Sequence, residues 1–256
     1  MKNYQKKSAF LILFGLFINI YSIHSQTNND VALYNWFDKA VGKENLELYN
    51  GPRHINFYRT FDKSHSYYIS EDYSNGNLNY QGQNYYNLNL KYDVNNDLLV
   101  LKSVGEYEYL GINLIKEKTA YFTLQNKKFI NIEINNPEHP AYMTGYYQEI
   151  VFSKNNTLYI KHHKRREKVI DAQKISDGSN ANSSDRFKEK NEFILKYKNE
   201  YYKIGSKSDV IKIFPEYKGQ IKKYYNNNSQ LEESDNKLFI ENLIKEINNL
   251  LPNASN

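Results

Sequence analysis

The sequence predicts a mainly β protein of the α+β class. We expect an antiparallel meander that forms a curved, barrel-like sheet or a sandwich, with a short N-terminal helix and two to three C-terminal helices. Apolar and polar residues alternate with a period of two between residues 55 and 202, the pattern of half-buried strands. Turn-forming residues interrupt this alternation at short intervals, and a helical period replaces it after residue 204. Tyrosine, which favours strands, occurs 25 times in 256 residues.

Residues 1–25 are typical of a secretory signal peptide. Three lysines lie among their first seven residues. The apolar residues 9–20 (AFLILFGLFINI) follow, and the segment ends at Ser25, a small residue suited to signal peptidase. The apolar stretch is shorter than the roughly 20 residues that cross a bilayer. We therefore expect an exported chain that starts near Gln26 and has no transmembrane span. The sequence contains no cysteine, which excludes disulfides and a lipidated cysteine.

The mature chain is expected to divide into residues 26–204, an N-terminal helix with an antiparallel β domain, and residues 205–256, a helical segment packed on the sheet. The N-terminal helix is predicted for residues 31–41, behind Asp30 as its cap. Its apolar residues share one face: Leu33, Trp36, Phe37 and Val41.

Two stretches show the strand pattern most clearly. In the first, four apolar residues alternate with polar ones, and they are therefore expected to face the core: Tyr86, Leu88, Leu90 and Tyr92. In the second, the alternating apolar residues are Ile130, Ile132 and Ile134. Short turn sequences such as Gln81-Gly82 separate the predicted strands and indicate consecutive hairpins.

Residues 171–185 (DAQKISDGSNANSSD) contain almost no apolar side chain and are predicted to form a flexible loop between strands. Beyond them, Ser206 and Asp209 resemble a capping box that starts a helix, and Pro215 is expected to kink or divide that helix. A last helix is predicted from about Ser234, with one apolar face: Ile240, Leu243, Ile244, Ile247 and Leu251.

The motifs favour no particular reaction. There is no Gly-x-Ser-x-Gly elbow, and the histidines lack metal-ligand spacing, so we expect no metal and no cofactor. Without the three lysines of the leader the charge is close to neutral, which argues against nucleic acid as a partner. A glycan or peptide hydrolase would need a carboxylate pair, which spacing alone does not identify. Candidate acids include Asp93, Glu106, Glu108, Glu133 and Glu149.

The densest charge lies between residues 161 and 168 (KHHKRREK), at the end of one predicted strand and in the connection that follows. Clustered ammonium and guanidinium groups suit phosphate or the acidic sugars of a glycan. The alternative is a solvated hairpin extension whose lysines discourage edge pairing. The candidate binding residues are Lys161, His163, Lys164, Arg165 and Arg166.

Five tyrosine doublets are the other unusual feature: Tyr67-Tyr68, Tyr85-Tyr86, Tyr146-Tyr147, Tyr201-Tyr202 and Tyr224-Tyr225. On a strand, each doublet sends one ring to either face. The outward rings would form an aromatic binding platform, although ordinary cross-strand packing explains the doublets equally well.

Several segments, spread over nearly all of the mature chain, resemble a family of uncharacterised secreted envelope proteins from Gram-negative bacteria that use TonB-linked outer-membrane receptors. They are residues 32–38 (ALYNWFD), 49–51 (YNG), 90–93 (LKYD), 111–115 (GINLI), 187–192 (FKEKNE) and 213–215 (IFP). The resemblance implies export and an envelope setting, periplasmic, outer-membrane-associated or secreted. It implies no reaction, ligand or catalytic residue.

Together these patterns favour a non-enzymatic binding or accessory protein for an envelope component, with an envelope protein or an anionic glycan as partner. Two alternatives stay open. One is a secreted hydrolase that uses a carboxylate pair. The other is an assembly factor that docks through an exposed apolar stripe on residues 240–251.

Overall fold

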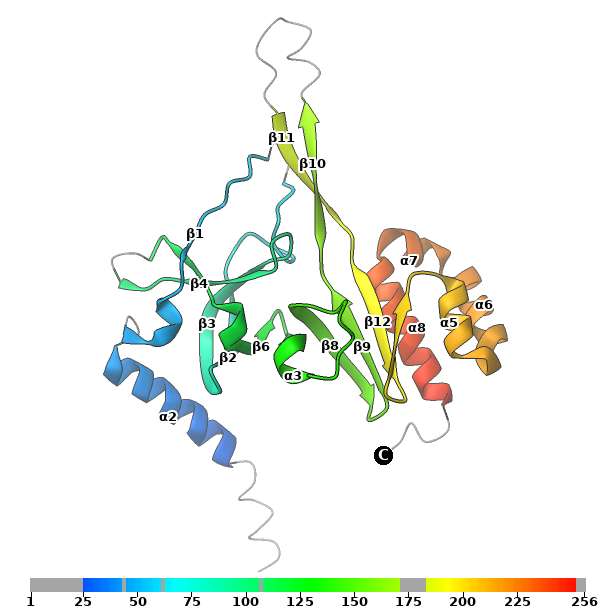
Figure 1. Cartoon of the computed structure of the whole chain (residues 1–256), viewed down its shortest axis with the longest axis horizontal. Coiled ribbons are helices and arrows are strands. Elements are labelled where there is room, and N and C mark those ends of the chain that lie inside the picture. Colours follow the sequence, from blue (N-terminus) through cyan, green and yellow to red (C-terminus); the bar gives the residue numbers. More distant parts are fainter. Residues whose placement is uncertain (1–24, 43–44, 61–62, 106–107, 171–182, 252–256) are drawn as a thin grey trace, which may run out of the picture.

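The computed structural model describes residues 25–42, 45–60, 63–105, 108–170 and 183–251. In this part of the chain, eleven antiparallel strands form one sheet, in the order β1-β5-β4-β3-β2-β6-β7-β8-β9-β12-β13 (Figure 1). The remaining two, β10 and β11, pair with each other. The strands are β1 (Arg53–His54), β2 (Ser74–Tyr80), β3 (Gln83–Asp93), β4 (Leu98–Lys102), β5 (Gly111–Asn113), β6 (Thr119–Leu124), β7 (Lys127–Asn131), β8 (Tyr146–Ser153), β9 (Asn156–Lys161), β10 (Lys164–Ile170), β11 (Ser183–Glu189), β12 (Glu192–Tyr197) and β13 (Glu200–Ile204).

The predicted mainly β fold is confirmed, but the sheet does not close into a barrel. Among the described strands, β1 and β13 each pair on one side only. The meander is also interrupted: β1 pairs with β5 instead of with β2, and β9 pairs with β12 across the inserted β10–β11 hairpin. Strands β2 to β5 form one run of hairpins and β6 to β9 another, and β6 pairs with β2 instead of with the preceding strand β5.

Three apolar clusters make the core, and β8 shows how they are placed. Its alternate residues Tyr146 and Ile150 belong to the first and second clusters, whereas Tyr147 belongs to the third. Since successive strand residues point to opposite faces, the first two clusters share one face of the sheet and the third lies on the other. The first is rich in aromatic rings that meet mostly edge to face, whereas Phe122 and Phe129 stack with centroids 4.8 Å apart.

Because apolar clusters lie on both faces of the sheet, two of the five tyrosine doublets are buried completely. Both rings of Tyr67-Tyr68 and of Tyr146-Tyr147 are buried. Core packing accounts for these two doublets, whereas Tyr201 and Tyr202 on β13 are half-buried and Tyr224-Tyr225 lies on helix α6. Tyr85 is buried and Tyr86 is only half-buried, because Asn87 adopts a positive φ of 56° and the β2–β3 register shifts beside it. The prediction that Tyr86 shares the core face of Leu88 is thus wrong.

A second local correction concerns the stretch expected to alternate through Ile134. The strand β7 ends at Asn131, whose side chain accepts a hydrogen bond from the Glu133 backbone N–H and starts the short helix α3 (Ile132–Asn135). Ile132 is buried and Ile134 is 43% exposed. Because the Asn131 side chain caps a helix, the residues that follow it are helical and do not continue the strand.

The N-terminal helix is present but longer than predicted and oriented differently. Helix α2 spans Ser25–Val41 and packs against β3, where the rings of Tyr34 and Tyr86 lie 6.1 Å apart. Leu33, Trp36 and Phe37 are exposed, whereas Asp38 is buried. The apolar stripe thus faces away from the protein.

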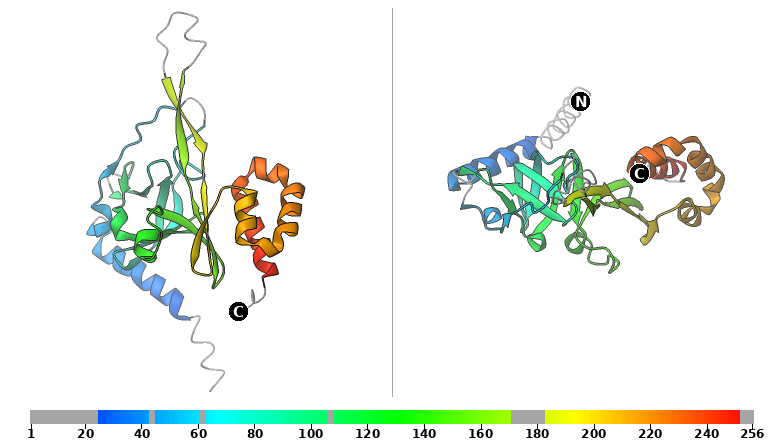
Figure 2. Two further views of the ribbon diagram at one scale, coloured as in Figure 1. Left: turned by 45° about the vertical axis from the view of Figure 1, so that its right-hand side comes forward. Right: turned by 90° about the horizontal axis from the view of Figure 1, so that it is seen from above.

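Four α-helices and one 3-10 helix follow β13 in the described chain, more than the two to three expected: α5 (Lys207–Ile213), η5 (Pro215–Tyr217), α6 (Lys218–Asn227), α7 (Ser229–Ser234) and α8 (Asn236–Leu250). Ser206 caps α5 and Pro215 ends that helical stretch, as predicted. The helices gather beside β9, β12 and β13 (Figure 2). No helix in the described ranges is both long and apolar enough to cross a membrane.

Packing of the last helix contradicts the assembly-factor alternative. Ile240, Leu243, Ile244 and Ile247 of α8 are buried in the second cluster, so the stripe is covered by the protein's own sheet.

The loop predicted for residues 171–185 is corrected in part. Residues 171–182 lie outside the described residues, but Ser183 begins β11, and Ser184 and Asp185 are buried.

Candidate binding surface on the β10–β11 ribbon

The charged segment around residue 164 forms half of a two-stranded ribbon that leaves the sheet (Figure 1). Strand β9 leads into β10, and β11 leads back into β12. The pairing runs in register from Lys164 opposite Glu189 to Ile170 opposite Ser183. At the base, the backbone N–H of Lys190 donates to the carbonyl of His163 at 2.8 Å. The predicted solvated connection is therefore a regular extension of two core strands.

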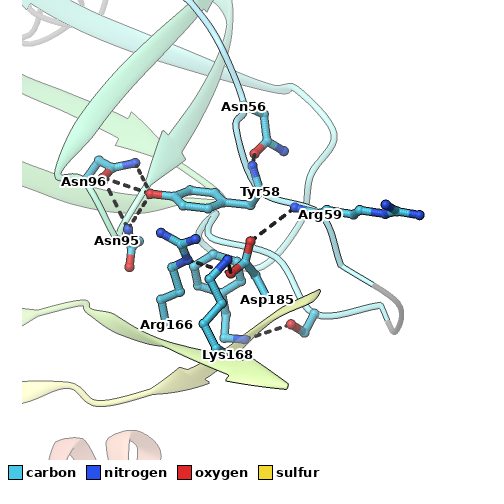
Figure 3. A network of polar contacts seen from close by, with 10 residues as sticks. Asn56, Tyr58, Arg59, Asn95, Asn96, Arg166, Lys168 and Asp185 are labelled. Carbon is cyan, nitrogen blue, oxygen red and sulfur yellow. Dashed lines mark hydrogen bonds and ion pairs between the residues drawn. The ribbon is translucent and has the colours of Figure 1, made fainter. Parts of the chain in front are cut away.

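Asp185 anchors the ribbon to the segment that follows β1 (Figure 3). Its side chain is 3% exposed and accepts from Arg166 Nε at 2.7 Å, and Lys168 Nζ lies 3.0 Å away. On the far side, Asp185 exchanges hydrogen bonds with the backbone of Arg59. Burial favours the protonated acid, but the bonds from Arg166 and Lys168 outweigh it and lower the pKa of Asp185.

Tyr58 ties the same ribbon to the turn between β3 and β4 (Figure 3). Its ring meets Phe187 at a centroid distance of 5.0 Å, and the Arg166 guanidinium lies 4.9 Å from its centroid. Its hydroxyl accepts from the Asn95 and Asn96 side chains at 2.9 and 3.0 Å. Arg166, proposed from the sequence as a binding residue, is thus a structural group that holds the ribbon in place.

Two more of the predicted binding residues turn inward. Lys161 lies 3.0 Å from Asp97 and donates to the Thr144 carbonyl at 2.9 Å. Lys164 donates to the backbone carbonyls of Tyr67 and His65 at 2.7 and 3.1 Å. Burial lowers the pKa of both lysines. The five predicted residues therefore do not form one basic patch.

The two adjacent histidines differ in environment. His163 is half-buried, and its backbone N–H donates to Asn191 Oδ1 at 3.3 Å. His162 is 4% exposed and its Nε2 lies 2.8 Å from Gln148 Oε1. Burial, aided by nearby lysines such as Lys237, lowers the pKa of His162 to about 3. Within the described residues, no three His, Cys, Asp or Glu side chains gather closely enough to hold a metal ion.

Arg165 is the one predicted residue that lies fully on the open face of the ribbon. Its side chain is 61% exposed, and Lys188, directly opposite on β11, is 59% exposed. Glu167 forms ion pairs with both, and Arg186 lies exposed opposite Glu167. The hydrogen bonds from Lys188 and Arg165 lower the pKa of Glu167. We call Arg165, Glu167, Arg186 and Lys188 the basic face, which carries three cations and one carboxylate.

The sequence-based search missed Arg186 and Lys188. A signal for them was available, because basic residues alternate at positions 186, 188 and 190. Recognising it required knowing that this stretch is a strand, paired in register with the charged segment of β10. Because residues 171–185 were predicted to form a flexible loop, the pairing of β11 with β10 was not expected.

A polar hollow of about 550 Å³ lies at the base of the ribbon, where β11 and β12 face the α7–α8 turn. It is lined by Glu189, Lys190, Asn191, Phe193 and residues 233–237. A narrower crevice that shares Glu189, Asn191 and Lys237 with it continues toward His163 and Lys164. This hollow combines cations, acids, an amide and one aromatic side chain.

The carboxylates named from the sequence do not gather in one place. Asp93 is buried and accepts from the Asn95 and Asn96 backbone, and Glu133 accepts from the Gly145 N–H. Glu108 and Glu149 form ion pairs with lysines, and Glu106 lies outside the described residues.

Comparison with protein-family models, curated protein sequences and solved structures found no match.

Proposed function

We propose that this protein is an exported, non-enzymatic binding or accessory protein of the bacterial envelope, which holds an anionic glycan on its ribbon. This proposal is based on the basic face of the ribbon. Arg165, Arg186 and Lys188 are exposed on a projecting element, and Glu167 lies among them. Clustered cations of this kind gain most from a polyanion.

The neighbouring hollow supports a sugar ligand. Its volume of about 550 Å³ lies within the range of small-molecule sites, and its lining is rich in polar hydrogen-bonding groups, whereas its one aromatic side chain, Phe193, is 7% exposed and belongs to the second core cluster. The polar lining suits the hydroxyls of a sugar. A glycan chain could occupy the hollow with one residue and lay its acidic groups along the basic face.

The test is binding of polygalacturonate, an anionic polysaccharide, compared with neutral dextran. The chain without residues 1–24 is suitable because it retains every described residue. We expect polygalacturonate to bind by calorimetry, more weakly as salt increases, and dextran to bind far less. Replacement of Arg165 and Lys188 by alanine should weaken binding by about tenfold or more.

The matched control replaces Lys222 and Lys223, two exposed lysines on α6, with alanine. It removes the same charge and should leave affinity nearly unchanged. Equal binding by the Arg165/Lys188 variant and the native protein, or equal binding of dextran and polygalacturonate, would refute glycan binding by the basic face.

Hydrolysis is the second candidate, and one observation favours it. Glu189, Glu233 and Asp235 line the same hollow. Asp235 Oδ1 caps α8 by accepting from the Leu238 N–H at 2.9 Å, and Glu189 Oε2 accepts from Asn191 Nδ2 at 3.4 Å; the acid pair of this second candidate is Glu233 with Glu189. If polygalacturonate or an envelope glycan is shortened by the protein and not by its Glu233→Gln variant, hydrolysis replaces binding as the function. Unchanged chain length supports binding.

A further inference from the structure

Helix α2 carries a second surface, which the proposed glycan binding does not use. Leu33, Trp36 and Phe37 are 61%, 65% and 48% exposed, whereas Asp38 on the opposite side is 6% exposed. A surface helix ordinarily turns its apolar stripe to the core. Here the orientation is reversed, so the stripe is available to something outside the protein. We call Leu33, Trp36, Phe37 and Val41 the apolar face of α2.

The apolar face borders a hollow of about 630 Å³. Its lining is uncharged and mostly apolar, formed by Leu33, Tyr34, Trp36, Phe37 and residues 81–83 of the β2–β3 turn. Without a charged group in the lining, nothing there selects an ionic ligand. The occupant suited to this surface is apolar and uncharged.

The position of α2 in the chain indicates which apolar partner is nearest. The helix begins at Ser25, and only residues 21–24 separate it from the apolar stretch 9–20. A leader of that composition enters a bilayer during export. This step rests on the export that the proposed function assumes: a leader in the bilayer brings the chain that follows it to a lipid surface.

We propose that α2 lies in the plane of a lipid bilayer interface, with its apolar face inserted among the headgroups and upper acyl chains. Tryptophan, phenylalanine and leucine on one face are the residues that interfacial helices use for this purpose. Lys39 is the only basic residue of the helix, so insertion depends on apolar area more than on anionic lipid. This binding is independent of the ribbon and should differ from it in salt dependence.

Trp36 allows a direct test, because it is the only tryptophan in the sequence and lies on the apolar face. Its fluorescence in the chain without residues 1–24 should shift to shorter wavelength when phosphatidylcholine vesicles are added. The shift should persist in about 0.5 M salt, where charge interactions beyond a few ångströms are screened. Vesicles with brominated acyl chains should quench the same emission. The full chain, measured alongside, shows what the leader adds.

Paired substitutions identify the surface. Leu33→Ser with Phe37→Ser should require about tenfold more lipid or higher for the same shift. The matched control, Phe57→Ser with Val151→Ser, removes two residues that are 81% and 63% exposed elsewhere, and should behave like the native protein. Circular dichroism and thermal melting establish that each variant is folded.

Three results would overturn the proposal. The first is the absence of a shift with every vesicle, and the second is an undiminished shift in the Leu33/Phe37 variant. The third is a concentration-dependent shift without lipid, accompanied by a doubled mass in solution. That last result would assign the apolar face to a second copy of the chain.

Discussion

Lys161 and Asp97 form an ion pair, with Nζ and Oδ2 3.0 Å apart, that joins the end of β9 to the turn between β3 and β4. Asp97 also accepts from Lys116 Nζ at 2.7 Å and from Tyr92 Oη at 2.6 Å. Gly145 passes so close that a Cβ there would lie 1.9 Å from Asp97 Oδ2. This cluster fastens the first run of hairpins to the second.

We expect Asp97→Asn to lower the free energy of unfolding by about 2–4 kcal/mol, because it leaves two half-buried ammonium groups without a counter-charge. Urea denaturation measures the change. Glu108→Gln is the control, since that side chain is 65% exposed and solvent screens its pair with Lys102, so the variant should be nearly as stable as the native protein. Equal losses for both variants would contradict a structural role for Asp97.

The same acid should make stability depend on pH below neutrality. Burial alone would raise the pKa of Asp97, but Lys161 and Lys116 hold it below its ordinary value. A lowered native pKa means that the stabilisation is present above the unfolded-state pKa, about 3.9, and is lost as the pH falls through the native value. The Asp97→Asn variant should therefore lose less stability than the native protein between about pH 4 and pH 2.

His162 should add a separate acid dependence at higher pH. Burial lowers its native pKa to about 3, whereas an unfolded histidine titrates near about 6.5. Between these values only the unfolded state takes up the proton, so stability falls as the pH is lowered. We expect a loss of about 2 kcal/mol from pH 7 to pH 5. His162→Gln keeps a donor for Gln148 and should remove that loss; an unchanged pH slope would mean that His162 is protonated in the fold.

Arg165 and Arg166 are adjacent, but their replacement should have different consequences. Arg166→Ala breaks the bond to buried Asp185 and removes the contact with Tyr58, so amide hydrogen exchange in β11 should accelerate. Arg165→Ala touches only the open face and should change stability by at most about 0.5 kcal/mol. Similar exchange in the two variants would show that the ribbon does not depend on the Asp185 anchor.

Leucine truncation distinguishes the core from the apolar face of α2. Leu90 is fully buried in the first cluster, and Leu90→Ala should cost about 2–5 kcal/mol. Leu33 is 61% exposed, so Leu33→Ala should cost no more than about 0.5 kcal/mol. A large loss at Leu33 in thermal melts would mean that the apolar face of α2 is packed against the protein in solution.

The region of the candidate site was predictable from the sequence, but most of its residues were not. The charge between residues 161 and 168 pointed to the segment that forms β10 of the ribbon. Several residues of this segment bind partners far away in the chain. Lys161 pairs with Asp97, Lys164 donates to the Tyr67 carbonyl, and Arg166 pairs with Asp185. Of the five predicted binding residues, Arg165 stays on the open face, where Arg186 and Lys188 from the facing strand join it.

The sequence alone determined the features that depend on neighbouring residues. Alternation predicted a mainly β fold, and Ser206 and Pro215 marked the helix boundaries correctly, because side-chain period, capping and the missing proline N–H act within a few positions. Tertiary structure decided the order of the strands, the burial of both rings in Tyr67-Tyr68 and Tyr146-Tyr147, and the outward direction of the apolar face of α2. A local pattern shows that one face of an element is apolar, but what that face meets depends on segments that lie far away in the chain.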